Sequence, residues 1–176
     1  MGKTAVIFCS ASKIIDPKYN EEAKKVVRCL CSKGITIVSG GTTKGTMGAV
    51  ADEAAKYSNG NIGIVPRFMA DVLNPNLSRI CWTDTMSERK EKMRELGKDY
   101  AIALPGGIGT LDEFFETYVL AKLQLYSGKI IAYNYNGFYD SLKEMMDAYV
   151  EKGMLDSGSR ALLHCPETIE ELEELL

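Results

Sequence analysis

Hydrophobic and polar positions divide the chain into two kinds of segment that alternate along its whole length. Short apolar runs rich in β-branched residues are bounded by Gly, Pro or Asn, which is typical of strands covered on both faces. Between them, apolar residues spaced three and four apart predict amphipathic helices. The predicted strands are Thr4–Cys9, Ile35–Ser39, Asn61–Val65, Arg79–Thr83, Tyr100–Leu104, Lys129–Tyr133 and Ala161–Cys165. The predicted helices are Tyr19–Ser32, Met47–Tyr57, Ser87–Gly97, Leu111–Tyr126, Phe138–Lys152 and Thr168–Leu175.

This alternation of strand and helix predicts the fold class. Strand–helix–strand units form right-handed crossovers between parallel strands. We therefore expect an α/β protein: a doubly wound, Rossmann-like parallel sheet of about seven strands with helices on both faces. No repeat, low-complexity tract or linker divides the 176 residues, so we expect a single domain over residues 1–176. Residues 66–78 form the one long irregular stretch and are predicted to be a lid or a pocket wall.

Composition and charge narrow the classes of partner. The formal net charge of −3 provides no strong basic field, so we expect neither nucleic acid nor a membrane surface as a partner. The first apolar run, Ala5–Cys9, is too short for the core of a signal peptide, and we expect a cytoplasmic protein. Five cysteines and one histidine favour reduced thiols over disulfides or a zinc site, and we expect no metal and no cofactor.

Two glycine-rich junctions follow predicted strands. One runs from Pro105 to Thr110, and the other runs from Gly40 to Gly48. Glycine lets the backbone approach a ligand closely, and the free N–H groups of the helix that follows attract a phosphate. A tight turn would explain one such loop, but two loops in equivalent positions favour an anion site at the carboxyl edge of the sheet.

Neither loop has the spacing of a common nucleotide fingerprint. A P-loop needs GxxxxGK[ST] after a strand, and a dinucleotide fold needs GxGxxG; here Asp112 stands where the third glycine belongs. The second strand also ends in Ser39 instead of an acid that would bind a ribose. A nucleoside monophosphate therefore fits the pattern better than a dinucleotide.

Glu113 allows two interpretations. Thr110 and Glu113 have the spacing of a capping box, in which the threonine caps a helix and the glutamate reaches back to it. Alternatively, the carboxylate follows the glycine loop by one turn, where it can stabilise a cationic transition state or activate water. The sequence leaves both interpretations open.

A second charged element opens the helix after the fourth strand. Thr85 and Glu88 have capping-box spacing, and Arg89 and Lys90 follow in the first turns. Cations there oppose the helix dipole by about 0.3–1 kcal/mol each. Either they meet an anion, for which the planar fork of arginine is suited, or they belong to a solvated charged face.

Together these motifs resemble the Lonely Guy family, the cytokinin-activating phosphoribohydrolases also labelled "lysine decarboxylase-like". The segment from Pro105 to Glu113 resembles that family's PGGxGTxxE signature, and Met86 to Met93 resembles its MxERKxxM element. The loop from Gly40 to Gly48 is similar to the family's GGGxxGLMG loop, with Thr42 and Thr43 replacing part of the glycine run.

The resemblance implies a Rossmann-like homodimer that hydrolyses the N-glycosidic bond of an adenine-type nucleoside 5′-monophosphate to free base and ribose 5-phosphate. It implies a catalytic pair, Glu113 and Arg89. The implied substrate-binding residues are Lys90, Gly106, Gly107, Gly109, Thr110, Gly41, Thr42 and Met86. The alternative is a non-catalytic nucleotide or cofactor carrier on the same fold, because a fold does not determine a function. Lysine decarboxylation is not implied, since no recognisable pyridoxal-phosphate lysine motif is present.

Overall fold

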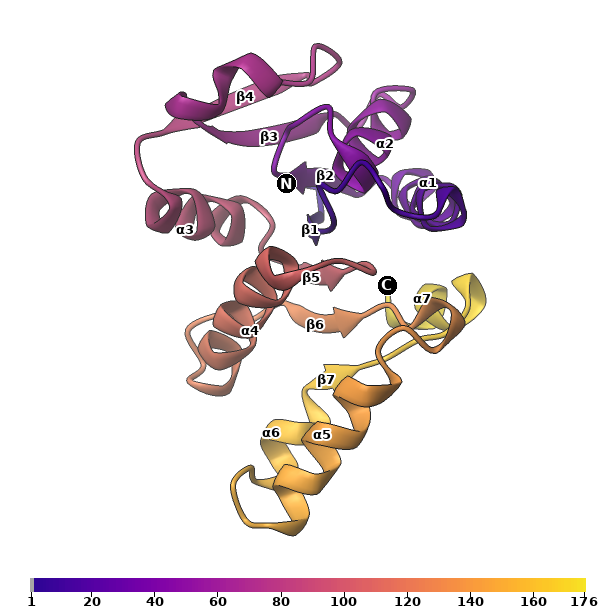
Figure 1. Cartoon of the computed structure of the whole chain (residues 1–176), viewed down its shortest axis with the longest axis vertical. Helices are drawn as coiled ribbons and strands as arrows, with labels where there is room; N and C mark the ends of the chain where they lie inside the picture. The colour runs from indigo at the N-terminus through magenta and orange to yellow at the C-terminus, as the bar shows by residue number, and fades with distance from the viewer. Residues whose placement is uncertain (1) are drawn as a thin grey trace.

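The computed structural model describes residues 2–176, which form one seven-stranded sheet flanked by helices (Figure 1). Every neighbouring pair of strands is parallel, and their order is β4-β3-β2-β1-β5-β6-β7. The strands are β1 (Thr4–Phe8), β2 (Thr36–Ser39), β3 (Asn61–Pro66), β4 (Arg79–Thr83), β5 (Tyr100–Ala103), β6 (Lys129–Ala132) and β7 (Leu163–His164). This arrangement confirms the predicted doubly wound parallel sheet.

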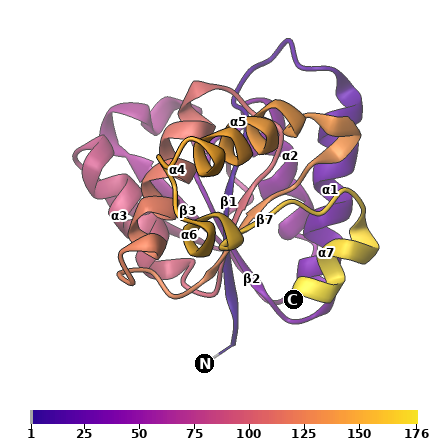
Figure 2. The same cartoon turned by 90° about the horizontal axis from the view of Figure 1, so that it is seen from below.

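Helices cover both faces of the sheet. The α-helices are α1 (Pro17–Ser32), α2 (Gly45–Ala54), α3 (Met86–Leu96), α4 (Ile108–Lys122), α5 (Asp140–Glu151), α6 (Ser157–Ala161) and α7 (Ile169–Leu175). Two 3-10 segments, η1 (Arg67–Val72) and η2 (Tyr135–Gly137), lie in the connections. Helices α1, α2 and α7 pack on one face and α3, α4, α5 and α6 on the other (Figure 2). No helix within residues 2–176 is long and apolar enough to cross a membrane.

The central strand β1 contributes side chains to two hydrophobic cores, one on each face of the sheet. Ala5 and Ile7 pack into the core under α1 and α2, whereas Val6 and Phe8 pack into the core under α3 and α4. All four side chains are at most 1% exposed. Successive side chains of a strand point to opposite faces, so a continuous apolar run is the pattern of a strand buried on both sides.

The strand order creates the crevice in which a ligand would bind. From β1 the chain winds outward through β2 and β3 to β4, and it then returns to place β5 on the other side of β1. The connections that leave the carboxyl ends of β1 and β5 therefore diverge, which opens a crevice between them. In open α/β sheets ligands bind at this kind of reversal.

Element boundaries differ from the predictions by a few residues, and three of the differences bear on the argument. Helix α4 begins at Ile108, before the predicted start at Leu111, because the exposed Ile108 and two glycines hid the amphipathic pattern. The last strand, β7, is only Leu163–His164; the preceding residues form α6, which Asp156 caps by accepting from Ser159 N at 2.7 Å. The irregular stretch 66–78 contains η1 and so is partly helical.

Candidate active site

A cavity of about 390 Å³ lies at the crevice between β1 and β5. Its walls come from the loops after β1 and β2, the starts of α3 and α4, and η1. The volume falls in the range of small-molecule sites, about 300–1,000 Å³. Among the residues singled out from the sequence, those that line it are Arg89, Glu113, Gly107, Gly109, Thr110, Thr42 and Met86.

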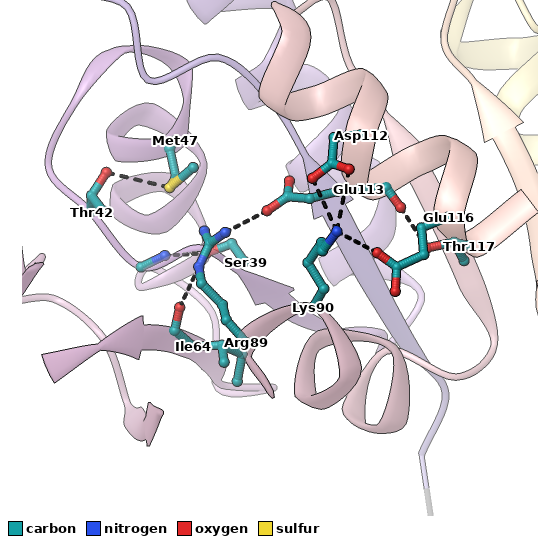
Figure 3. A network of polar contacts seen from close by, with 11 residues as sticks. Ser39, Thr42, Met47, Ile64, Arg89, Lys90, Asp112, Glu113, Glu116 and Thr117 are labelled. Atoms are coloured by element: carbon teal, nitrogen blue, oxygen red, sulfur yellow. Dashed lines mark hydrogen bonds and ion pairs between the residues drawn. The ribbon is translucent and has the colours of Figure 1, made fainter. Parts of the chain in front are cut away.

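An ion pair between Arg89 and Glu113 joins α3 to α4 at the cavity (Figure 3). Arg89 Nη1 lies 2.5 Å from Glu113 Oε1, and Arg89 Nε donates to the carbonyl oxygen of Ile64 at 3.1 Å. The side chains of Arg89 and Glu113 are only 5% and 8% exposed. Removing one member of such a buried pair typically costs about 3–5 kcal/mol, because the other charge is left uncompensated.

The start of α3 sets the position of Arg89. Thr85 caps the helix, its hydroxyl oxygen accepting from Glu88 N at 3.1 Å, and the Glu88 carboxylate accepts from Asp84 N at 2.8 Å. Thr85 is therefore the N-cap, as the spacing predicts, whereas Glu88 reaches back to Asp84 N and not to Thr85 N as in a capping box. With that start fixed, Arg89 faces the sheet and is buried.

The same interpretation is wrong for Thr110 and Glu113. The N-cap of α4 is Gly107, so Thr110 and Glu113 both lie within the helix. The Glu113 carboxylate bonds to Arg89 and does not reach back to the start of the helix. Helix capping therefore does not explain why a glutamate stands at position 113.

Burial and charge act in opposite directions on Glu113. Burial raises the pKa of the Glu113 carboxyl above its ordinary value, and the adjacent Arg89 guanidinium opposes that rise. Cys9, at the end of β1, lines the same cavity. Burial strongly raises the pKa of its thiol, and the charge of Glu113 raises it further. Cys9 is therefore a neutral thiol at physiological pH and a poor nucleophile.

The start of α4 offers backbone donors to the cavity. Gly107 caps the helix with no side-chain hydrogen bond, and the first turn carries no acidic residue. A Cβ atom added at Gly107 or Gly109 would meet nothing within 4 Å, so their backbone is open to a ligand. Free N–H groups at a helix start together with the helix dipole form an anion site.

Three residues expected to bind substrate, Gly41, Gly106 and Lys90, lie outside the cavity lining. Gly41, with φ of +69°, packs beneath the cavity against Val65 and Gly63. Gly106 leaves room for the side chain of Thr110. These two glycines allow close packing next to the residues that line the cavity but do not line it themselves. A glycine pattern in the sequence does not distinguish between these two roles.

Lys90 lies between α3 and α4 (Figure 3). Its Nζ pairs with Asp112 at 3.1 Å and with Glu116 at 2.5 Å, and its side chain is 17% exposed. These pairs raise the pKa of Lys90, so its ammonium is charged. The lysine holds the two helices together on the side away from Thr42 and Met47.

The cavity lining also includes Met47, from the glycine-rich loop Gly40–Gly48, together with Met69 and the segment Cys9–Ser12, none of which was assigned to substrate binding from the sequence. Met69 comes from η1, so the prediction that residues 66–78 form a pocket wall is confirmed. That segment is held to the glycine loop by Thr43 N donating to Val72 O and Asn74 N donating to Gly41 O, both at 2.9 Å. The irregular sequence pattern of residues 66–78 predicted a pocket wall, but it did not predict that Met69 would be the side chain lining the cavity.

No group of three or more His, Cys, Asp or Glu within residues 2–176 is placed to hold a metal ion. The polar groups that the cavity offers are an arginine, two carboxylates, hydroxyls and backbone amides. Such a set can bind a phosphate at the start of α4 and present a carboxylate to a reacting carbon.

The fold and this crevice define a Rossmann-like α/β protein with a cavity of small-molecule size at the reversal of strand order. Comparison with known proteins identifies the family. The family described as "Possible lysine decarboxylase" matches residues 47–176, and the chain belongs to that family. Its members include proteins named cytokinin riboside 5′-monophosphate phosphoribohydrolase, the Lonely Guy proteins.

Two such relatives match nearly the full chain. The enzyme LOG2 of Arabidopsis thaliana is 29% identical, over 96% of this chain and 81% of its own. The enzyme of Rhodococcoides fascians is 30% identical, over 90% of this chain and 81% of its own. Among solved structures, the molybdenum cofactor binding protein of Rippkaea orientalis has a TM-score of 0.74 at 19% identity, covering 99% of this chain and 96% of that one. That likeness shows the fold alone.

Proposed function

We propose that this protein hydrolyses the N-glycosidic bond of an adenine-type nucleoside 5′-monophosphate, AMP or a cytokinin riboside monophosphate. The products are the free base and ribose 5-phosphate. The observation that carries the proposal is the buried Arg89–Glu113 pair at the cavity that the start of α4 borders. The names of the Arabidopsis and Rhodococcoides relatives support the same reaction.

We assign the phosphate to the start of α4, where the backbone of Gly107, Gly109 and Thr110 faces the cavity. With the phosphate there, the ribose lies over Glu113, and the base extends toward Thr42 and Met86. The apolar part of the wall then meets the flat face of the base, which needs no charged partner.

Cleavage of the N-glycosidic bond requires the protein to stabilise positive charge on the ribose. As the C1′–N bond breaks, its electron pair leaves with the base and the ribosyl group becomes cationic. The ionised Glu113 carboxylate stabilises or traps that cation, or activates water, while Arg89 fixes the orientation of the carboxylate. Water supplies the hydroxyl at C1′ and the proton that the departing base takes up.

We propose that Lys90 aids substrate binding without lining the cavity itself. Asp112 lines the cavity and would repel a phosphate, but Lys90 neutralises it from the far side at 3.1 Å. Lys90 therefore aids substrate binding through Asp112, and Gly106 and Gly41 aid it by shaping the backbone.

The test is a base-release assay across AMP, isopentenyl-AMP, GMP and CMP. We expect release from the adenine nucleotides, and a loss to near background in Glu113→Gln. Glu91→Gln, an exposed glutamate on α3 with no ion pair in the described residues, is the matched control and keeps activity. Full activity in Glu113→Gln would exclude the assigned role of Glu113.

A non-catalytic carrier is the second candidate, because the Rippkaea protein of the same fold is named as a molybdenum cofactor binding protein. A carrier would hold a phosphorylated ligand at one equivalent per chain without converting it. Retention of the Arg89–Glu113 pair favours the enzyme. Lysine decarboxylation, which the family description mentions, predicts carbon dioxide release from lysine with bound pyridoxal phosphate, and we expect neither.

We further propose a homodimer formed through α4. This helix and Leu123, which follows it, expose a stripe of apolar side chains that includes Ile108, Val119 and Leu123, which are 87%, 53% and 58% exposed. Leu111 and Phe115 join the stripe in an open hollow on the same helix. Light scattering tests the proposal: we expect a dimer that Val119→Glu dissociates, and a monomeric wild type at micromolar concentration would contradict it.

We place the action of the protein in the cytoplasm. Cys9, Cys29 and Cys31 are free and buried, which suits a reducing compartment. Subcellular fractionation of the native protein tests this assignment.

A further inference from the structure

Gly40, at the end of β2, lies directly beside the guanidinium of Arg89. A Cβ atom added at Gly40 would overlap Arg89 Nη2 and would lie 2.5 Å from Met47 Sδ. Both contacts would be closer than real Cβ atoms make with non-bonded neighbours. The absence of a side chain at position 40 therefore creates the space that these two side chains occupy.

Backbone conformation does not explain this glycine. Gly41, the next residue, has φ of +69° and so adopts the left-handed region that side chains disfavour. Gly40 is not among the glycines with positive φ. Its backbone is open to any residue, so the need for glycine at position 40 comes from the neighbouring side chains.

The two neighbours differ in their freedom to move. Met47 has a flexible thioether end that faces the cavity, so it can rotate away from a methyl group. Arg89 is 4% exposed and is held by Ile64 O on one side and Glu113 on the other. Its guanidinium can shift only by breaking one of those contacts.

We propose that Gly40 is a positioning residue, which seats the Arg89 guanidinium so that Nη1 meets the Glu113 carboxylate. It acts through Arg89 and does not touch the substrate. The expected effect on turnover rests on the proposed hydrolysis, but the steric relation between Gly40 and Arg89 does not. Stability measurements can therefore test the relation even if the protein proves to be a carrier.

The first experiment compares Gly40→Ala with wild type in the base-release assay. A displaced guanidinium should lower kcat by about 10²-fold, the loss typical of a misplacement of about 1 Å, with a smaller change in KM. Gly158→Ala on α6 is the matched control, because its nearest neighbour, Asp156 Oδ1, lies at 3.3 Å and needs to give only a few tenths of an ångström, and neither residue lines the cavity. It should keep full activity. A Gly40→Ala enzyme with unchanged kcat would overturn the proposal.

The pH profile separates positioning from general damage. The charged or titratable groups that face Glu113 are Arg89 and Lys90 from α3, Asp112 on α4 and Cys9 at the end of β1. Moving Arg89 away removes the main influence that lowers the pKa of Glu113. The acidic limb of the kcat profile should therefore move to higher pH in Gly40→Ala. A loss of rate with no shift of this limb would overturn the assignment.

A double-mutant cycle with Arg89→Ala tests the steric relation without turnover. In wild type the added methyl group competes with the guanidinium, so Gly40→Ala should lower the urea midpoint clearly. In Arg89→Ala the space is vacant, so the same change should cost much less. If Gly40→Ala alone does not fold, a folded Gly40→Ala/Arg89→Ala protein supports the proposal. Equal cost in both backgrounds, or a double variant that is unfolded while Arg89→Ala alone is folded, overturns it.

Discussion

Arg89 Nη1 and Glu113 Oε1 meet at 2.5 Å although the two residues stand 24 positions apart on different helices. Arg89 is also fixed to the carbonyl oxygen of Ile64, so the contact joins α3, α4 and the end of β3. A charged pair held in this way is oriented before any ligand arrives, and oriented charge is the largest single contribution in many enzymes.

Arg89→Lys should lose most of the activity while keeping the charge. A lysine ammonium is a compact charge without the planar fork, so it cannot serve Ile64 and Glu113 in the present geometry. We expect kcat to fall by about 10²-fold. Steady-state kinetics checks this, and an Arg89→Lys enzyme within a factor of about two of wild type would show that simultaneous contact with Ile64 and Glu113 is not needed.

Activity should rise with pH through the pKa of Glu113, because the assigned role needs the ionised carboxylate. Burial places this pKa above the ordinary value of 4.5. The acidic limb of the kcat profile should therefore lie above that value. A limb at or below pH 4.5 would indicate that another group controls the rate.

Stability should change with pH in the opposite direction. Because folding raises the pKa of Glu113, the folded state holds its proton more tightly than the unfolded chain does. The resulting stabilisation is fully present below pH 4.5 and is lost as the pH rises through the folded pKa. Urea unfolding of wild type and Glu113→Gln across this window checks the sign. As the pH rises, the free energy of unfolding of wild type should fall relative to that of Glu113→Gln. A difference independent of pH would mean that Glu113 titrates alike in both states.

Gly109→Ala should separate binding from folding. A Cβ atom there meets nothing in the protein, and alanine favours a helix over glycine by about 0.8–1 kcal/mol. The free energy of unfolding should therefore stay equal or increase. The methyl group would enter the cavity beside the assigned phosphate, so KM should rise. An unchanged KM would move the phosphate away from the start of α4.

Lys90→Met should have a mild effect if the lysine acts through Asp112 and Glu116. Its partners are 56% and 34% exposed, so solvent screens the pairs, and we expect a loss of about 1 kcal/mol or less in unfolding free energy. KM should rise by only a few fold. A rise of about 100-fold or more would indicate direct contact between Lys90 and the substrate phosphate.

The sheet was predictable because its strands are buried on both faces. Runs such as the one in β1 carry apolar residues without interruption, and helices separate them regularly. The same logic located the crevice, since the glycine-rich loops had to follow strands at one edge. Helix starts were harder: the amphipathic pattern of α4 appears only after Ile108, an exposed apolar residue, and Gly109.

The partners of individual side chains were less predictable than the elements. The spacing of Thr110 and Glu113 suited a cap equally well, and only the start of α4 at Ile108 decides against it. The ion pairs of Lys90 run between two helices whose packing the sequence does not specify. Met69 reaches the cavity from a stretch whose pattern showed no regular element.

The measurement that tests the central claim most directly is the yield of both products from AMP or isopentenyl-AMP. Wild-type protein should release free base and ribose 5-phosphate in equal amounts over many turnovers, and Glu113→Gln should release neither above background while still binding the nucleotide. Intact nucleotide recovered from wild type after stable binding would contradict hydrolysis and would favour the carrier.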